Sequence, residues 1–274
     1  MTDITTTDGT RLHVADSGGE GRPVVLIHGW PLSSESWSEQ VGPLRDAGHR
    51  VVTYDRRGFG SSDKPEGGFD YDTLADDLQA VITGLDLTDA TLVGFSMGGG
   101  EVARYVSRHG QDRLHSVVFA AAVPPYLLKT DDNPDGPLEK DAAAEMRQGL
   151  EQDRDGFLDQ FATGFFSVGD ELKVTEEQRQ EAVAMAAQSD QGAALGCMDA
   201  WATTDFRGDL GSITVPTLVV HGEGDATVPY DGSAVRTHAA VAGSELVPVP
   251  DAPHGLNVSH AAEFNSALLG FLAR

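Results

Sequence analysis

The chain has 274 residues, of which 40% are hydrophobic, and a formal net charge of −24 at pH 7. This length suits one large domain, or one domain with an inserted subdomain, and the apolar content is enough for a sizeable core. The negative charge argues against nucleic acid and anionic membranes as partners, because both are bound through basic surfaces. The sequence contains no apolar run of about 18 residues, the minimum for a membrane helix.

The first residues and the number of cysteines indicate the cellular compartment of the protein. Residues 1–5 are polar and acidic, unlike the basic and then apolar pattern of a signal peptide. Cys197 is the only cysteine, so an intrachain disulfide is excluded. We therefore expect a cytoplasmic protein. The sequence does not set the oligomeric state and is compatible with a homo-oligomer.

Taken in chain order, short apolar runs alternate with helical patterns over residues 1–121. Helices are predicted from about residue 34, over 71–85 and directly after 96. The apolar runs that predict strands are 12–14, 23–28, 51–54, 90–95 and 114–121. This alternation is typical of an α/β fold whose parallel sheet is wound by right-handed crossovers.

The pattern changes after residue 121. Up to about residue 207 no strand is predicted, only helices at 138–152, 155–166, 175–188 and 191–203. Alternation then resumes, with strands at 216–221 and 245–249 and helices at 233–241 and near the C-terminus. We expect a core made of residues 1–121 and 210–274, with a helical lid inserted at 122–209 over the carboxyl edge of the sheet.

The most informative stretch is Gly94-Phe95-Ser96-Met97-Gly98, which lies between a predicted strand and a predicted helix. This is the G-x-S-x-G motif in the strand–turn–helix context that it requires. A serine on such a sharp turn adopts strained backbone angles, so the positions two residues away must lack a Cβ. The motif predicts that Ser96 is a nucleophile. The alternative is a glycine-rich packing turn with an incidental serine.

Two more polar residues follow predicted strand ends, Asp225 in a Gly-x-Gly-Asp turn and His254 in a Pro-His-Gly turn. The order Ser96, Asp225, His254 is that of α/β-hydrolases. A serine hydroxyl is a weak nucleophile and needs an adjacent base. His254 would take its proton, while Asp225 would fix the histidine tautomer and stabilise the imidazolium.

Other acids and histidines compete for these roles. Asp251 lies only three residues before His254 and would not easily reach the far ring nitrogen. His260 falls in the last predicted helix, too far from the loop. His28 ends a strand before a glycine–aromatic turn, where we expect a structural hydrogen-bond donor. The sequence also contains no paired spacing such as H-E-x-x-H, which disfavours a metalloenzyme.

An oxyanion hole requires two donors aimed at the developing negative charge. We expect one to be the backbone N–H of Met97, the residue after the nucleophile. The second should be the N–H of Trp30, because Pro31 has none to offer. Trp30, Met97, Phe161 and Trp201 are also the candidate walls of an apolar substrate pocket.

A wider set of motifs lies at residues 28–33, 54–62, 94–98, 100–105, 127–136, 204–207 and 252–256. In these stretches the chain resembles a known family, the cofactor-free bacterial haloperoxidases, which are α/β-hydrolase esterases with perhydrolase activity. The resemblance extends to the predicted lid. The sequence differs most from the family between about residues 139 and 202. The resemblance implies an eight-stranded sheet with a helical lid, a Ser-Asp-His triad, and no haem, metal or other cofactor.

The leading hypothesis is a serine hydrolase that cleaves small apolar or aryl carboxylic esters through an acyl-enzyme. The resemblance adds a perhydrolase side activity, in which hydrogen peroxide and a carboxylic acid are the partners. A lactonase or γ-lactamase would use the same triad, and a haloalkane dehalogenase would need aspartate in place of Ser96. From a different class, a non-catalytic ligand-binding protein on this fold also stays open.

Overall fold

The computed structural model of the chain describes residues 2–274. Its centre is an eight-stranded sheet in the order β1-β2-β4-β3-β5-β6-β9-β10, in which β1–β2 and β2–β4 are antiparallel pairs and the other pairs are parallel. The predicted mostly parallel, eight-stranded sheet is therefore confirmed. The strands are β1 (Thr2–Thr5), β2 (Arg11–Asp16), β3 (Pro23–Ile27), β4 (Arg50–Tyr54), β5 (Ala90–Phe95), β6 (Leu114–Ala120), β9 (Thr217–Gly222) and β10 (Glu245–Val249).

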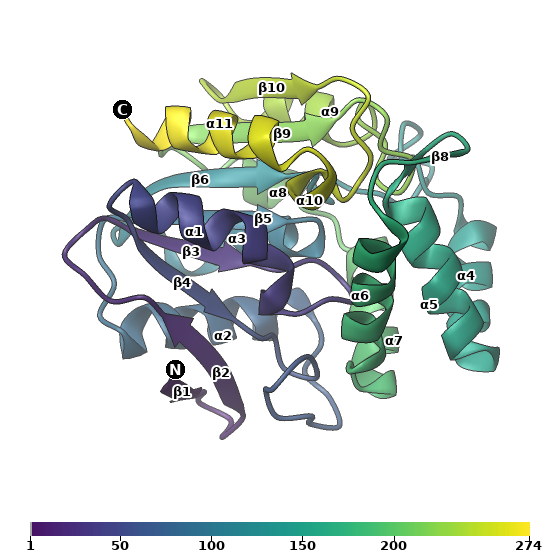
Figure 1. Ribbon diagram of the computed structural model, residues 1–274, viewed down its shortest axis with the longest axis horizontal. Coiled ribbons are helices and arrows are strands. Elements are labelled where there is room, and N and C mark those ends of the chain that lie inside the picture. Colours follow the sequence, from purple (N-terminus) through teal and green to yellow (C-terminus); the bar gives the residue numbers. More distant parts are fainter. Residues whose placement is uncertain (1) are drawn as a thin grey trace.

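Helices cover both faces of the sheet (Figure 1). One face carries α1 (Ser38–Asp46), α10 (Leu256–Ser259) and α11 (Ala261–Leu272), and the short 3₁₀ helix η1 (Ser34–Trp37) leads into α1. The other face carries α2 (Tyr71–Gly84), α3 (Met97–His109), α8 (Arg207–Leu210) and α9 (Ala234–Ala240). Because both faces are covered, all six residues of β5 are buried, as its continuous apolar run predicts.

A helical segment, defined here as residues 140–203, connects β6 to β9. It comprises α4 (Lys140–Gln152), α5 (Arg154–Phe165), α6 (Glu176–Ala187) and α7 (Gln191–Thr203). All four predicted helices are confirmed to within two residues at each end. In Figure 1 they lie beyond the arrowheads of the parallel strands, at the carboxyl edge of the sheet.

The expectation that this segment contains no strand was wrong. A small antiparallel hairpin, β7 (Ser167–Val168) and β8 (Glu171–Leu172), joins α5 to α6. Its turn includes Gly169, whose φ of +58° suits a residue without a Cβ. Two-residue strands are too short to show an alternating pattern. Strand β1 was also missed, because its sequence is polar and only its pairing with β2 defines it.

No helix within residues 2–274 is long and apolar enough to cross a membrane.

Candidate active site

Ser96 lies between β5 and α3 at φ 53° and ψ −119°, outside the regions that residues with a Cβ favour. A Cβ on Gly94 would lie 2.4 Å from the carbonyl oxygen of Gly98, and one on Gly98 would lie 2.5 Å from the carbonyl oxygen of Ile27. Both contacts are far inside van der Waals distance. The steric requirement for glycine on each side of the serine is thus confirmed, and the surrounding backbone holds the strained turn in place.

The structure brings together the three polar residues predicted at strand ends. The Ser96 Oγ lies 2.9 Å from His254 Nε2, and His254 Nδ1 lies 2.6 Å from Asp225 Oδ2. Ser96 follows β5, Asp225 follows β9 and His254 follows β10, so the three side chains meet at the carboxyl edge of the sheet. All three residues are buried, with exposed fractions of 6%, 5% and 1%.

The surroundings of Asp225 fix its charge and the tautomer of His254. Oδ1 accepts hydrogen bonds from the backbone N–H groups of Thr227 (2.9 Å) and Val228 (2.8 Å). Burial alone would raise the pKa of Asp225, but the charge of His254 and hydrogen bonds from His221 and His254 lower it to about 2. An ionised carboxylate only accepts, so His254 Nδ1 carries the proton. Its Nε2 is then free to accept the Ser96 hydroxyl proton.

The competing residues have other partners. Asp251 is exposed, and its carboxylate pairs with Lys173 Nζ at 2.7 Å. The buried His28 accepts the N–H of Arg56 through Nε2 (3.0 Å), and its Nδ1 lies 2.8 Å from the Gly29 carbonyl, to which it donates. Burial and the charge of Arg56 lower the pKa of His28 to about 3, so the ring is neutral. The His260 ring contacts Ser259 at the end of α10.

The loop after β3 packs directly on the nucleophile turn. A Cβ on Gly29 would lie 3.1 Å from the Ser96 Cβ, so the absence of that atom permits the close approach. The backbone N–H groups of Trp30 and Met97 have no acceptor in the part of the chain that the structure describes. The Trp30 indole donates to the Ala194 carbonyl in α7 at 2.9 Å, which fixes this loop against the helical segment.

A buried ion pair supports the turn from below. Arg56 Nε donates to Glu101 Oε1 at 2.5 Å, and the Tyr54 hydroxyl donates to Oε2 at 2.6 Å. Arg56 also donates to the His28 carbonyl at 2.7 Å. Burial raises the pKa of Glu101, and the charge of Arg56 opposes that rise. Through these contacts the pair joins the ends of β3 and β4 to α3, and the two buried charges neutralise each other.

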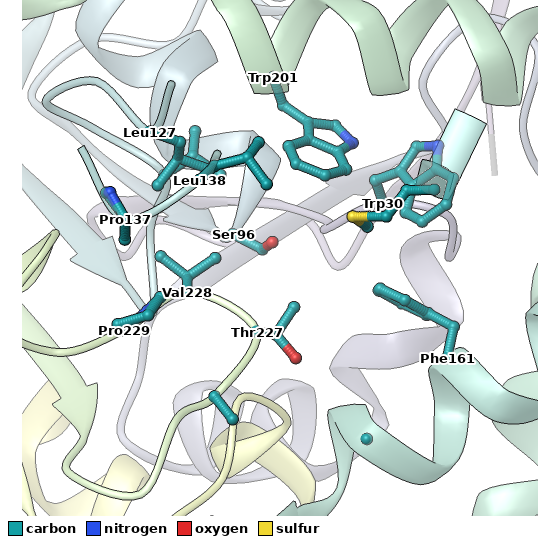
Figure 2. Close-up of a pocket in the computed structure, with 14 residues that line it drawn as sticks. Trp30, Ser96, Leu127, Pro137, Leu138, Phe161, Trp201, Thr227, Val228 and Pro229 are labelled. Carbon is teal, nitrogen blue, oxygen red and sulfur yellow. The ribbon is translucent and has the colours of Figure 1, made fainter. Parts of the chain in front are cut away.

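A cavity of about 280 Å³ opens next to the Ser96 side chain. In Figure 2, Ser96 lies between an aromatic side and an aliphatic side of this cavity. None of the lining residues is charged. The aromatic side is formed by Trp30, Phe161 and Trp201, and the aliphatic side by Leu127, Pro137, Leu138, Val228 and Pro229.

Of the four predicted pocket walls, Trp30, Phe161 and Trp201 line the cavity and Met97 does not. The Met97 side chain is fully buried in the hydrophobic core, so the expectation that it forms a pocket wall was wrong. Sequence reasoning missed the aliphatic side altogether. Leu127 and Leu138 come from the long stretch between β6 and α4, which shows no periodicity, although Val228 and Pro229 follow Asp225 closely enough to have been considered.

Comparison with known proteins agrees with this geometry. A profile described as alpha/beta hydrolase fold matches residues 22–261. The chain belongs to the α/β-hydrolase fold family. It is 43% identical to a non-heme chloroperoxidase of Kitasatospora aureofaciens, over 98% of each chain, and 37% identical to a bifunctional esterase/perhydrolase of Acinetobacter calcoaceticus, again over 98% of each.

A solved structure of a bromoperoxidase from Bacillus anthracis superposes with a TM-score of 0.97, at 47% identity and over 100% of both chains. These relatives confirm the resemblance to the haloperoxidases over the whole chain. Within the α/β-hydrolases, the chain is therefore a serine hydrolase of the non-heme chloroperoxidase and esterase/perhydrolase group.

Proposed function

We propose that the protein is a carboxylesterase that cleaves small apolar or aryl esters, with Ser96, His254 and Asp225 as its catalytic triad. The observation that carries this proposal is the hydrogen-bonded chain from Ser96 through His254 to Asp225, which opens onto an uncharged cavity. An apolar cavity favours neutral substrates, because a charged group would lose its hydration there without gaining a partner. The esterase named among the relatives supports the same class of substrate.

In this proposal the Ser96 Oγ attacks the ester carbonyl carbon while its proton passes to His254 Nε2. The tetrahedral intermediate collapses as His254 returns that proton to the leaving alcohol, and an acyl-enzyme remains on Ser96. Water then attacks the acyl carbon, again giving a proton to His254, and the carboxylic acid and free serine are released. Asp225 stays ionised throughout and stabilises the imidazolium at each step.

The backbone N–H groups of Trp30 and Met97 are proposed as the oxyanion hole. Both lie in segments that pack against Ser96 and neither has a protein acceptor within residues 2–274. They would therefore be available to the carbonyl oxygen as it gains negative charge. Loss of one such donor typically costs about 2.7–4 kcal/mol of transition-state stabilisation.

A perhydrolase side activity uses the same acyl-enzyme. A carboxylic acid acylates Ser96 with loss of water, and hydrogen peroxide replaces water in the second step and releases a peracid. We propose that Pro31 sets the direction of the Trp30 carbonyl, which would accept a hydrogen bond from the peroxide. Residues 122–209 are proposed to act as a lid that supplies much of the cavity wall.

The proposal is tested with Ser96→Ala and p-nitrophenyl acetate. We expect kcat to fall by at least about 10⁴-fold, as loss of a nucleophile does in other serine hydrolases, with an unchanged circular dichroism spectrum. Ser259→Ala, which removes a hydroxyl five residues after His254, serves as the control and should retain wild-type turnover. Substantial hydrolysis by a folded Ser96→Ala protein would refute the assignment of the nucleophile.

A further inference from the structure

His221 is a second histidine in contact with the acid of the triad. It lies in β9, four residues before Asp225, and has no exposed surface. Its Nε2 is 3.0 Å from Asp225 Oδ2 and 2.8 Å from the Val228 carbonyl oxygen. A carbonyl and an ionised carboxylate can only accept, so Nε2 must carry a hydrogen, which it donates to the Val228 carbonyl and which also faces the Asp225 carboxylate.

The other ring nitrogen shows that His221 is neutral. Nδ1 is buried and has no hydrogen-bond partner among residues 2–274. A proton there would place an unsatisfied donor and a positive charge in the interior. The aromatic ring of Tyr230 packs against the imidazole with ring centroids 5.9 Å apart. The titratable groups that face His221 are thus Asp225, Tyr230 and, across the Asp225 carboxylate, His254.

Four donors therefore face the Asp225 carboxylate. The N–H groups of Thr227 and Val228 hold Oδ1, and the imidazoles of His254 and His221 share Oδ2. His221 also ties this carboxylate to the Val228 carbonyl, and Val228 itself lines the cavity. Without His221, only His254 would hold Oδ2, and the plane of the carboxylate would be set by the Oδ1 contacts alone.

We propose that His221 is a positioning residue of the triad. It orients the Asp225 carboxylate and weakens the hydrogen bond between that carboxylate and protonated His254. This inference rests on the proposed function, in which Asp225 and His254 act together. A neutral donor on Oδ2 draws electron density from the oxygen that faces His254 Nδ1. Loss of that donor should leave His254 as the only imidazole on Oδ2 and make the bond to a protonated His254 stronger.

Two substitutions separate the hydrogen bond from the packing. His221→Gln can place an amide N–H where the Nε2–H lies, whereas His221→Phe keeps a ring of similar shape and removes the donor. We expect His221→Phe to lower kcat for p-nitrophenyl acetate about tenfold or more, the size of effect that follows loss of a hydrogen bond to a charged group. KM should stay within about twofold, because His221 does not line the cavity.

The pH dependence of kcat/KM distinguishes this role from a purely structural one, which would leave it unchanged. In His221→Phe, the acidic limb of kcat/KM should shift to higher pH by about half a unit or more, since His254 holds its proton more tightly. His221→Gln should restore the wild-type limb and recover most of kcat. If His221→Phe does not fold, His221→Asn makes the same deletion, because its shorter amide cannot reach Asp225.

The inference is overturned if the acidic limb of the donor-free variant coincides with that of the wild type or lies at lower pH. It is also overturned if His221→Gln is as impaired as the donor-free variant, because packing would then explain both losses. Ser96→Ala is measured in the same series. Turnover by that variant would refute the proposed function itself, whereas an inactive Ser96→Ala beside an unaffected His221→Phe would refute only the role of His221.

Discussion

The carboxyl edge of the sheet and the helical segment meet at one cavity, but they are built in different ways. The edge supplies Ser96, Asp225 and His254, which are buried and follow strands of the central sheet. The helical segment supplies Phe161 and Trp201, which are only partly buried and lie on α5 and α7, beyond the carboxyl edge of the sheet. The groups needed for chemistry thus follow strands of the sheet, whereas part of the cavity wall comes from an inserted helical segment that packs against the same hydrophobic core.

The ion pairs of the two regions also differ, one being buried and the other exposed. Under the nucleophile turn, the Arg56–Glu101 pair is fully buried and also bonded to Tyr54 and to the His28 carbonyl. Between α4 and α7, the Arg147–Asp199 pair is 38% and 55% exposed, so water and salt screen it. We therefore expect substitutions at the sheet edge to act on kcat or on folding, and substitutions in the helical segment to act on substrate preference.

The largest effect is expected from Asp225→Asn. An asparagine would no longer fix the Nδ1–H tautomer of His254, and comparable changes in serine proteases lower kcat by about 10⁴-fold. The matched control is Asp251→Asn, since Asp251 is also an aspartate near His254 but pairs with Lys173 on the surface. Steady-state kinetics on p-nitrophenyl acetate would show the contrast. A severe loss in Asp251→Asn and a mild one in Asp225→Asn would reverse the assignment of the acid.

The next effect concerns the strained turn. Gly98→Ala would force a Cβ to within 2.5 Å of the Ile27 carbonyl oxygen, so the backbone around Ser96 must shift. We expect the free energy of unfolding to fall by about 1–3 kcal/mol, as overpacking does elsewhere, together with a loss of kcat. Gly270→Ala in α11 meets no atom within 4 Å and should instead stabilise by about 0.5–1 kcal/mol.

Urea denaturation of both alanine variants provides the measurement. Equal and small changes at the two glycines would show that the close packing at Gly98 does not constrain the turn.

A smaller effect, selective for the substrate, is expected from Phe161→Ala. Removing this ring enlarges the aromatic side of the cavity. We expect kcat/KM for aryl esters to fall by a factor that corresponds to about 1–3 kcal/mol of lost transition-state stabilisation. Ethyl acetate, which cannot fill that side, is the matched control substrate and should lose much less. The comparison of kcat/KM for phenyl acetate and ethyl acetate measures this difference. Equal losses for both esters would mean that the helical segment does not select the substrate.

The smallest effect is expected from Arg147→Gln, which breaks the exposed contact between α4 and α7. Exposed ion pairs contribute at most about 1 kcal/mol, so the free energy of unfolding should fall by less than that and kcat should not change. Denaturation at low and high salt would check this, since screening should erase even the small difference. A loss of several kcal/mol would mean that the helical segment is held by its surface charges.

The same contrast explains what the sequence could predict. Ser96, Asp225 and His254 follow apolar runs that end in turns, and parallel strands place such ends at one edge, so their meeting was foreseeable. Phe161 was among the predicted pocket walls, and it lies on a predicted helix. Leu127 and Leu138 were not, because they lie on an irregular stretch whose path only tertiary packing determines. The contact of His221 with Asp225 was hidden for a similar reason, since it depends on how the Gly222–Gly224 turn folds back.

The central claim is that Ser96 forms a covalent acyl intermediate in this cavity, and a phosphonate inhibitor tests it most directly. The protein would be incubated with the inhibitor, assayed with p-nitrophenyl acetate, and digested for mass spectrometry. We predict one adduct per chain, on Ser96, with hydrolysis lost in proportion to its occupancy. Hydrolysis that persists while Ser96 stays unmodified, or an adduct on another residue that accounts for the lost activity, would contradict the account.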